Sequence, residues 1–145
     1  MTPMTSSLPA LSIPAPTDPV SSAEHWGWLR RHELRIQRCL ECGTTRNPPA
    51  ELCYACHGTA TESIPLPLNG RIFTWTRVWH PIGEAFRAHV PYLLAWIEID
   101  HPDRPRFLGN IVGDPMQPVE IGDAVDGVFE DRDGGTILNW ARVAP

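Results

Sequence analysis

Four cysteines in two Cys-x-x-Cys pairs are the residues of this chain whose types and spacing best fit a chemical role. Cys39 and Cys42 form the first pair and Cys53 and Cys56 the second, with ten residues between the pairs and no other cysteine in 145 residues. Each pair can place two thiolates on one tight turn, and two facing turns offer four sulfurs in the tetrahedron that suits Zn²⁺. Four protein ligands leave no open position on the metal, so the sequence predicts a structural zinc site.

Three other uses of the same thiols have to be weighed against zinc. Two disulfides are disfavoured because we expect the chain in the cytoplasm, where thiols stay reduced. A catalytic dithiol is disfavoured because redox motifs usually occur as a single pair on a βαβ unit. An iron centre with four thiolates uses the same ligands and stays open as an alternative.

The residues next to the cysteines fit two tight metal-binding turns. Gly43 and Gly58 lie one and two residues past the second cysteine of each pair, where a positive φ is useful. His57 is a further residue able to bind metal, but four cysteines already complete the site. We therefore expect His57 on the surface of its turn.

The composition argues against several kinds of catalyst. The chain has no lysine, so no side chain can form a Schiff base with a carbonyl substrate. No Ser-His-Asp arrangement, phosphate-binding loop or pair of carboxylates is recognisable from its spacing. The formal net charge of −5 gives no long-range attraction to nucleic acid or to an anionic membrane. A stand-alone enzyme would have to use a histidine such as His80 or His89 as its base.

The first twenty residues differ in composition from the rest of the chain. They carry five prolines and one charged side chain, Asp18. Proline interrupts every apolar stretch here, which argues against a secretory signal or a membrane-spanning helix. We expect residues 1–20 to form a disordered arm, partly in the polyproline conformation, on a cytoplasmic protein.

The elements that must position the cysteines begin with a short helix. Ser21 to Glu24 has the spacing of a capping box, and Trp26 and Leu29 then follow a helical repeat, which predicts a helix over residues 22–32. Alternation from Leu34 to Arg38 predicts a strand that enters the zinc ribbon. Residues 21–36 are thus assigned to the helix and this strand, and 37–60 to the ribbon.

Beyond the cysteines the hydrophobic period changes to two. Strands are predicted over residues 70–80, 91–100, 106–112, 124–130 and 136–143, the last two joined by a hairpin turn at DRDGG. Five short antiparallel strands with glycine-rich turns are typical of a small closed barrel of the OB type. The predicted fold is therefore mainly β, with the barrel occupying residues 61–145 and the zinc ribbon stabilising it.

The loop of residues 81–90 is the longest connection between these strands and a candidate recognition site. We predict that Trp79, His80, Phe86 and Tyr92 on and beside it contact a substrate. The alternative is that the aromatic residues of the strands fill the core, which we expect individually for Trp75, Trp79 and Trp96.

A second candidate surface is basic. The predicted helix and its exit carry Arg30, Arg31, Arg35 and Arg38 against only Glu24 and Glu33. Such a cluster can meet phosphates or an acidic protein surface, or it can be a solvated helix face.

The order of these motifs resembles that of a known family. ELRIQRC is followed by C-x-x-CG, NPP, C-x-x-C, a glycine-led strand, a Pro-Tyr-led strand and a late IGDAV segment, between about Trp26 and Trp140. This order is similar to that of the rubredoxin-like zinc ribbon plus OB-fold proteins that accompany thiolases and thiolase-like, lipid-transfer-protein-type enzymes in acyl-CoA metabolism. The resemblance supports zinc at the four cysteines, position by position.

The resemblance implies a dependent role. It predicts an accessory subunit that docks on a thiolase-like partner and helps to form an acyl-CoA pocket, with retro-aldol cleavage of a steroid side-chain CoA thioester as one candidate reaction. It supplies no acid, base or nucleophile, so we assign no catalytic residue and expect no turnover by the chain alone. The alternative is a zinc-ribbon and OB-fold module that binds single-stranded nucleic acid.

Overall fold

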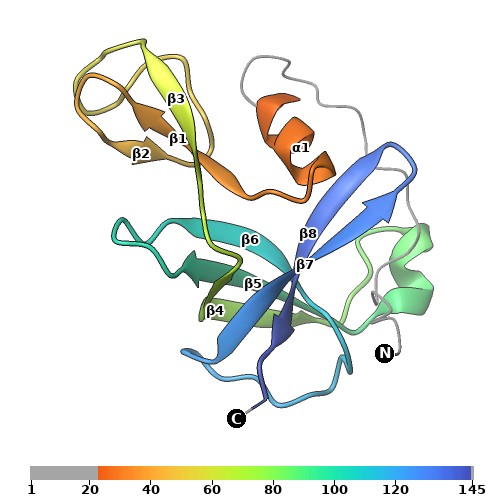
Figure 1. Ribbon diagram of the computed structural model, residues 1–145. Helices are drawn as coiled ribbons and strands as arrows, with labels where there is room; N and C mark the ends of the chain where they lie inside the picture. Colours follow the sequence, from red (N-terminus) through yellow and green to blue (C-terminus); the bar gives the residue numbers. More distant parts are fainter. Residues whose placement is uncertain (1–22, 145) are drawn as a thin grey trace.

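The computed structural model describes residues 23–144 and contains a short helix, a three-stranded sheet and a five-stranded closed barrel (Figure 1). The mainly β fold predicted from the sequence is confirmed, including its N-terminal helix and its barrel. The predicted arm of residues 1–20 and Ser21 of the predicted capping box lie outside the described residues. No helix within residues 23–144 is long and apolar enough to cross a membrane.

The three-stranded sheet belongs to the cysteine-rich part of the chain. Its antiparallel strands lie in the order β2-β1-β3, with the bounds Arg35–Cys39 for β1, Thr45–Arg46 for β2 and Thr61–Pro65 for β3. β1 pairs along its whole length with β3, so that Cys39 lies opposite Thr61. β3, which falls in the stretch predicted as barrel, is therefore hydrogen-bonded into the sheet of the ribbon.

The barrel is closed by strands that are distant in sequence. Its order is β4-β5-β6-β8-β7, with the bounds Asn69–Val78 for β4, Tyr92–Ile99 for β5, Arg106–Ile111 for β6, Ala124–Arg132 for β7 and Gly135–Arg142 for β8. Each of the five predicted strands overlaps one of these. β6 and β8 pair in parallel at Ile111 and Trp140, and β4 pairs with β7 to complete the ring.

Side chains that alternate along the strands fill the barrel. On β5, Leu93, Ala95, Ile97 and Ile99 are all buried, and the fully buried Trp140 of β8 packs in the same core. The hydrophobic transfer of these residues out of water is the main favourable term for the barrel.

The tryptophans expected in the core divide into two groups. Trp75 is partly buried against the core, as expected, but Trp79 and Trp96 are 60% and 43% exposed. The expectation was wrong for these two because residues with odd numbers on β5 point inward, which turns Trp96 outward, and because Trp79 lies just past the end of β4.

The helix is shorter than predicted. α1 (Ala23–Arg30) stops before residue 32, because His32 has a positive φ of 57°, a conformation that ends helices. The His32 ring stacks on Phe129, with 4.9 Å between ring centroids, and its Nε2 lies 2.9 Å from a carboxylate oxygen of Asp131. These contacts attach the end of α1 to the β7–β8 hairpin.

Three polar contacts join the ribbon to the barrel. The Leu66 N–H donates to the Leu34 carbonyl over 2.8 Å, which ties the chain before β4 to the chain before β1. The side-chain amide of Asn47, just past β2, donates to the Arg106 carbonyl on β6 over 2.9 Å. The Thr45 hydroxyl donates to Asp103, between β5 and β6, over 3.2 Å.

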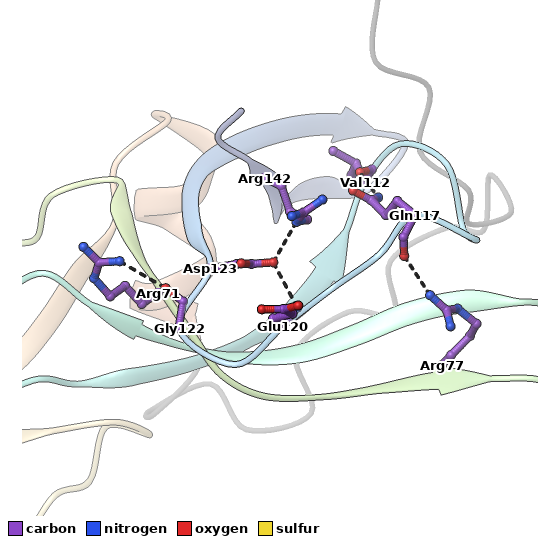
Figure 2. A network of polar contacts seen from close by, with 8 residues as sticks. All are labelled: Arg71, Arg77, Val112, Gln117, Glu120, Gly122, Asp123 and Arg142. Carbon is purple, nitrogen blue, oxygen red and sulfur yellow. Dashed lines mark hydrogen bonds and ion pairs between the residues drawn. The ribbon is translucent and has the colours of Figure 1, made fainter. Parts of the chain in front are cut away.

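A polar network holds the loop between β6 and β7 (Figure 2). The Asp123 carboxylate accepts hydrogen bonds from the Glu120 N–H and from Nε of Arg142, both over 2.9 Å. Arg71 donates to the carbonyl of Gly122, which has a φ of 93° that favours glycine. These contacts give a physical reason for the Gly-Asp pair in the IGDAV segment.

The same loop is also tied to β4 and to its own start. Arg77 donates to the carbonyls of Pro115 and Gln117, each over 2.8 Å. The Gln117 side chain in turn donates to the Val112 carbonyl over 3.0 Å (Figure 2). Side chains of β4 and of the loop itself thus satisfy several backbone carbonyls of this segment.

The packing of Gly109 against Trp140 gives a first prediction. A Cβ at residue 109 would lie 2.7 Å from two atoms of the buried indole, which has no room to move. We expect Gly109→Ala to lower the free energy of unfolding by roughly 1–3 kcal/mol, the usual cost of overpacking. The matched control is Gly83→Ala, where a Cβ meets nothing within 4 Å, with an expected change within about 0.5 kcal/mol. Equal denaturation midpoints for the two variants in urea would contradict this packing.

Candidate functional site

The four cysteines predicted as metal ligands lie together at one end of the ribbon. Their Sγ atoms are all within 4.8 Å of one another, with 3.6 Å between Cys39 and Cys56 and between Cys42 and Cys53. Zn–S bonds of about 2.3 Å in a tetrahedron give sulfur–sulfur distances of about 3.8 Å. A disulfide needs about 2.05 Å, and all four cysteines are free. The donor set and its spacing therefore fit a tetrahedral metal ion.

Two similar backbone turns present these sulfurs. In the first turn the Gly43 N–H donates to the Cys39 carbonyl over 2.9 Å, and in the second the His57 N–H donates to the Cys53 carbonyl over 2.8 Å. Both donors have positive φ, 79° for Gly43 and 63° for His57. The expectation that Gly58 takes this conformation was wrong, because the two turns match residue for residue and residue 57 holds the equivalent place.

Gly58 serves the site in another way. Its N–H donates to the Cys56 sulfur over 3.4 Å, and a Cβ there would lie 3.2 Å from the same sulfur and collide with the end of the Glu41 side chain. Close approach of the backbone to the sulfur, rather than a left-handed φ, is what glycine allows at this position.

Hydrogen bonds and neighbouring sulfurs shift the pKa values of two of the thiols in opposite directions. The backbone N–H of Cys56 favours the thiolate of Cys53 and lowers the pKa of Cys53 to about 6. At Cys56 the Gly58 N–H also favours the thiolate, but burial and the neighbouring sulfurs outweigh it and raise the pKa of Cys56 to about 12. Four thiolates at these distances repel one another unless a positive charge lies between them.

The site has the character of a closed structural centre. Cys39 and Cys53 are buried, Cys42 and Cys56 are exposed, and each contributes one sulfur to the cluster. His57 is exposed, as expected, and is not part of the group of candidate ligands. A metal with four sulfur ligands has no open coordination position for a substrate. The role of this site is therefore structural: a metal bound there holds the two turns together.

The predicted substrate-contacting residues are only partly brought together. The loop of residues 81–90 contains a 3₁₀ helix, η1 (Glu84–His89), and the Phe86 ring on it lies 6.4 Å from the buried Tyr92 ring, centroid to centroid. Trp79 and His80 are exposed where β4 ends, and within residues 23–144 no ring contact joins them to this pair.

An apolar patch on the outside of the barrel was missed by the sequence analysis. Phe73 on β4, Trp96 on β5 and Leu108 on β6 are 42%, 43% and 51% exposed, and we call these three residues the barrel patch. Trp96 lies directly opposite Leu108, and the Arg106 guanidinium lies 3.5 Å from the centroid of the Phe73 ring. Leucine and tryptophan at the outward positions of a predicted barrel strand are the signal that could have revealed it.

All four arginines of the basic cluster predicted from the sequence make contacts within the protein, and two of them pair with carboxylates. Arg30 donates to the Gly134 carbonyl, and the guanidinium of Arg31 lies 5.0 Å from the Trp28 ring centroid. Arg35 donates to Glu33 and to the Ser63 carbonyl. Arg38 donates to Glu62. These arginines therefore serve mainly to brace α1 and the ribbon.

Comparison with protein families finds two adjoining matches that cover most of the described chain. Residues 26–62 match the model described as the rubredoxin-like zinc ribbon domain of ChsH2, and residues 63–130 match the one described as the C-terminal OB-fold domain of ChsH2. The boundary between the two matches falls within β3, the strand that pairs with β1.

Individual relatives agree with these matches. The chain is 36% identical over 113 residues to a DUF35 domain-containing scaffold protein of Methanocaldococcus jannaschii, covering 74% of this chain and 78% of that protein. It is 26% identical over 125 residues to the 3-oxo-4,17-pregnadiene-20-carboxyl-CoA hydratase alpha subunit of Mycobacterium tuberculosis, covering 86% of this chain but only 39% of that subunit. A solved structure described as an Ltp2-ChsH2(DUF35) aldolase superposes with a TM-score of 0.79 and 25% identity, over 90% of this chain and all of the matched one.

The role of the cysteines can be tested by metal content. We expect Cys39→Ser and Cys56→Ser to lose stoichiometric zinc and to unfold the ribbon, because metal binding of this kind supplies on the order of 10 kcal/mol to folding. Acidification should also release the metal, because each thiol must lose its proton to bind.

The matched control is His57→Asn, which keeps an exposed residue able to adopt positive φ beside the same cysteine. It should retain one zinc per chain by elemental analysis and an unchanged ribbon by NMR. Full zinc content and a folded ribbon in Cys39→Ser would show that the four-sulfur site is not structural.

Proposed function

The chain belongs to the ChsH2 family of proteins with a rubredoxin-like zinc ribbon and an OB-fold domain, and on this premise we propose that it is an accessory subunit of a complex that processes acyl-CoA thioesters. Relatives described as a scaffold protein, a CoA-thioester hydratase subunit and an aldolase complex support this proposal. The chain also lacks lysine, and all of its cysteines belong to the metal cluster, so the nucleophiles of amine-dependent aldolases and of thiolases are missing.

The barrel patch is the observation that carries a docking role. Its three large apolar side chains lie on adjacent strands and face outward, although an outward barrel face in water is normally polar. Contiguous exposed apolar groups of this kind mark surfaces that another protein covers. Arg106 beside Phe73, itself paired with Glu98, supplies the polar edge typical of such interfaces.

The partner in this proposal is a thiolase-like or lipid-transfer-protein-type subunit that holds the catalytic groups. The chain would complete an acyl-CoA pocket with the loop of residues 81–90, using Trp79, His80 and Phe86 as contacts. Tyr92 is buried against Phe86 and would hold the loop in place. Retro-aldol cleavage of a steroid side-chain CoA thioester, in the cytoplasm, is the specific reaction that we propose.

Co-expression with a candidate partner tests the proposal directly. We expect the zinc-loaded chain to co-purify with a thiolase-like subunit, and we expect turnover of an acyl-CoA thioester by the complex but not by the purified chain. Clean separation of the two proteins at micromolar concentration, or turnover by the chain alone, would contradict it. Salt-sensitive, submicromolar binding of single-stranded DNA or RNA would favour the nucleic-acid alternative instead.

Substitutions in the barrel patch test the docking face. Trp96→Gln and Leu108→Gln should weaken partner binding by at least about thirty-fold, the effect of losing an interface hot spot, and should leave zinc content unchanged. Ile121→Gln, which replaces a still more exposed apolar side chain on the loop before β7, is the matched control and should bind normally. The affinities can be measured by titration calorimetry, and equal losses in all three variants would argue against a specific patch.

A further inference from the structure

Arg46 on β2 is the one arginine in the described chain that is both buried and incompletely paired. Its residue is 5% exposed, and neither terminal nitrogen of its guanidinium, Nη1 or Nη2, has a hydrogen-bond partner among the described residues. A buried guanidinium with unmet donors is strongly unfavourable, and native proteins rarely leave such groups without an acceptor. The acceptor for Arg46 is therefore to be sought outside the described residues.

Contacts within the chain already fix the position of this guanidinium before any partner binds. Nε of Arg46 donates to the Gln37 side-chain oxygen over 2.7 Å, and the same oxygen accepts the Ala50 N–H over 3.0 Å. β1 and β2 pair at these positions, with Gln37 opposite Arg46. The one satisfied nitrogen thus holds the side chain in place, while the other two are buried without an acceptor.

Arg46 lines a small niche between α1 and the ribbon sheet. The niche has a volume of about 20 Å³. This is enough for one or two oxygen atoms and too little to enclose a phosphate group. The exposed Glu24 of α1, Trp28 and Arg35 also line this niche. Arg35 is already engaged by Glu33 and a backbone carbonyl, which leaves Arg46 as the cation in need of an anion.

We propose that this niche binds one carboxylate, supplied by an acidic side chain of the partner subunit. The proposal rests on the accessory role proposed above, which provides a second polypeptide. A carboxylate offers two oxygens that match the paired Nη1 and Nη2 donors of arginine, and it carries the charge that the site lacks. The niche then gives the ribbon a polar contact with the partner, separate from the barrel patch.

This role predicts an unusual combination of effects for one substitution. Arg46→Met keeps most of the side-chain bulk and removes the buried charge, so the isolated zinc-loaded chain should show a higher melting temperature. The same variant should bind the partner at least about tenfold more weakly, because a buried ion pair is lost from the complex. Arg38→Met, which removes an arginine of β1 already paired with Glu62, is the matched control and should leave partner affinity unchanged.

Unchanged partner affinity in Arg46→Met would overturn the proposal while leaving the accessory role intact. Failure of the wild-type chain to bind any partner would instead contradict the accessory role. In that case carboxylate binding in the niche is measured on the isolated chain. There, at constant ionic strength, acetate should raise the melting temperature relative to chloride for the wild type but not for Arg46→Met. Equal responses would overturn the niche. A response to inorganic phosphate that is larger than the response to acetate, and that is absent in Arg46→Met, would also overturn it by assigning the site to a phosphate ligand.

Two further variants address a folding failure and an internal carboxylate. If Arg46→Met does not fold, Arg46→Lys keeps the charge but loses the two-nitrogen fork, and it should still bind the partner more weakly than the wild type. Glu24→Gln should leave stability and partner affinity unchanged. A loss of stability in both Glu24→Gln and Arg46→Met would show that Glu24 supplies the carboxylate from within the chain, and this would overturn the proposal.

Discussion

Mutual repulsion among four thiolates is the constraint from which the arrangement of this protein follows. Four thiolates with sulfur atoms within 4.8 Å of one another need a cation between them, and a cation bound there holds two backbone turns relative to each other. β1 ends in the first of these turns and β3 begins just after the second, so the cysteine cluster lies at one end of this strand pair. Leu34, directly before β1, then accepts a hydrogen bond from the chain that leads into the barrel.

The distribution of polar groups separates structural tasks from recognition. Most arginines of the described chain brace the fold through carboxylates or backbone carbonyls, as at the loop before β7 and along α1. Two features of the described residues are candidates for recognition: the barrel patch, which is exposed, and the buried guanidinium of Arg46 in the ribbon, which is incompletely paired. Neither can perform a reaction alone, and both become favourable when a second surface covers them, which is what an accessory subunit requires.

The sequence was sufficient for the cysteine cluster and the five barrel strands, because ligand spacing and a period of two are local signals. It was insufficient where a side chain's environment depends on distant strands. Trp96 could be core or surface until the register with β6 was known, and the basic cluster on α1 and β1 could not reveal that its arginines are already paired. Arg46 stands in a two-residue strand between the first cysteine turn and a pair of prolines, where no periodicity marks a buried position.

The amide of Asn47 spans the junction between the ribbon and β6, and it meets the backbone of Arg106, the residue whose guanidinium covers Phe73. The two modules are therefore not interchangeable parts. A chimera that joined the ribbon of one relative to the barrel of another would have mismatched contacts between the two modules unless residues 45–47 and 103–106 came from the same relative. We therefore expect substitutions in these two segments, although they are far apart along the chain, to occur together among relatives.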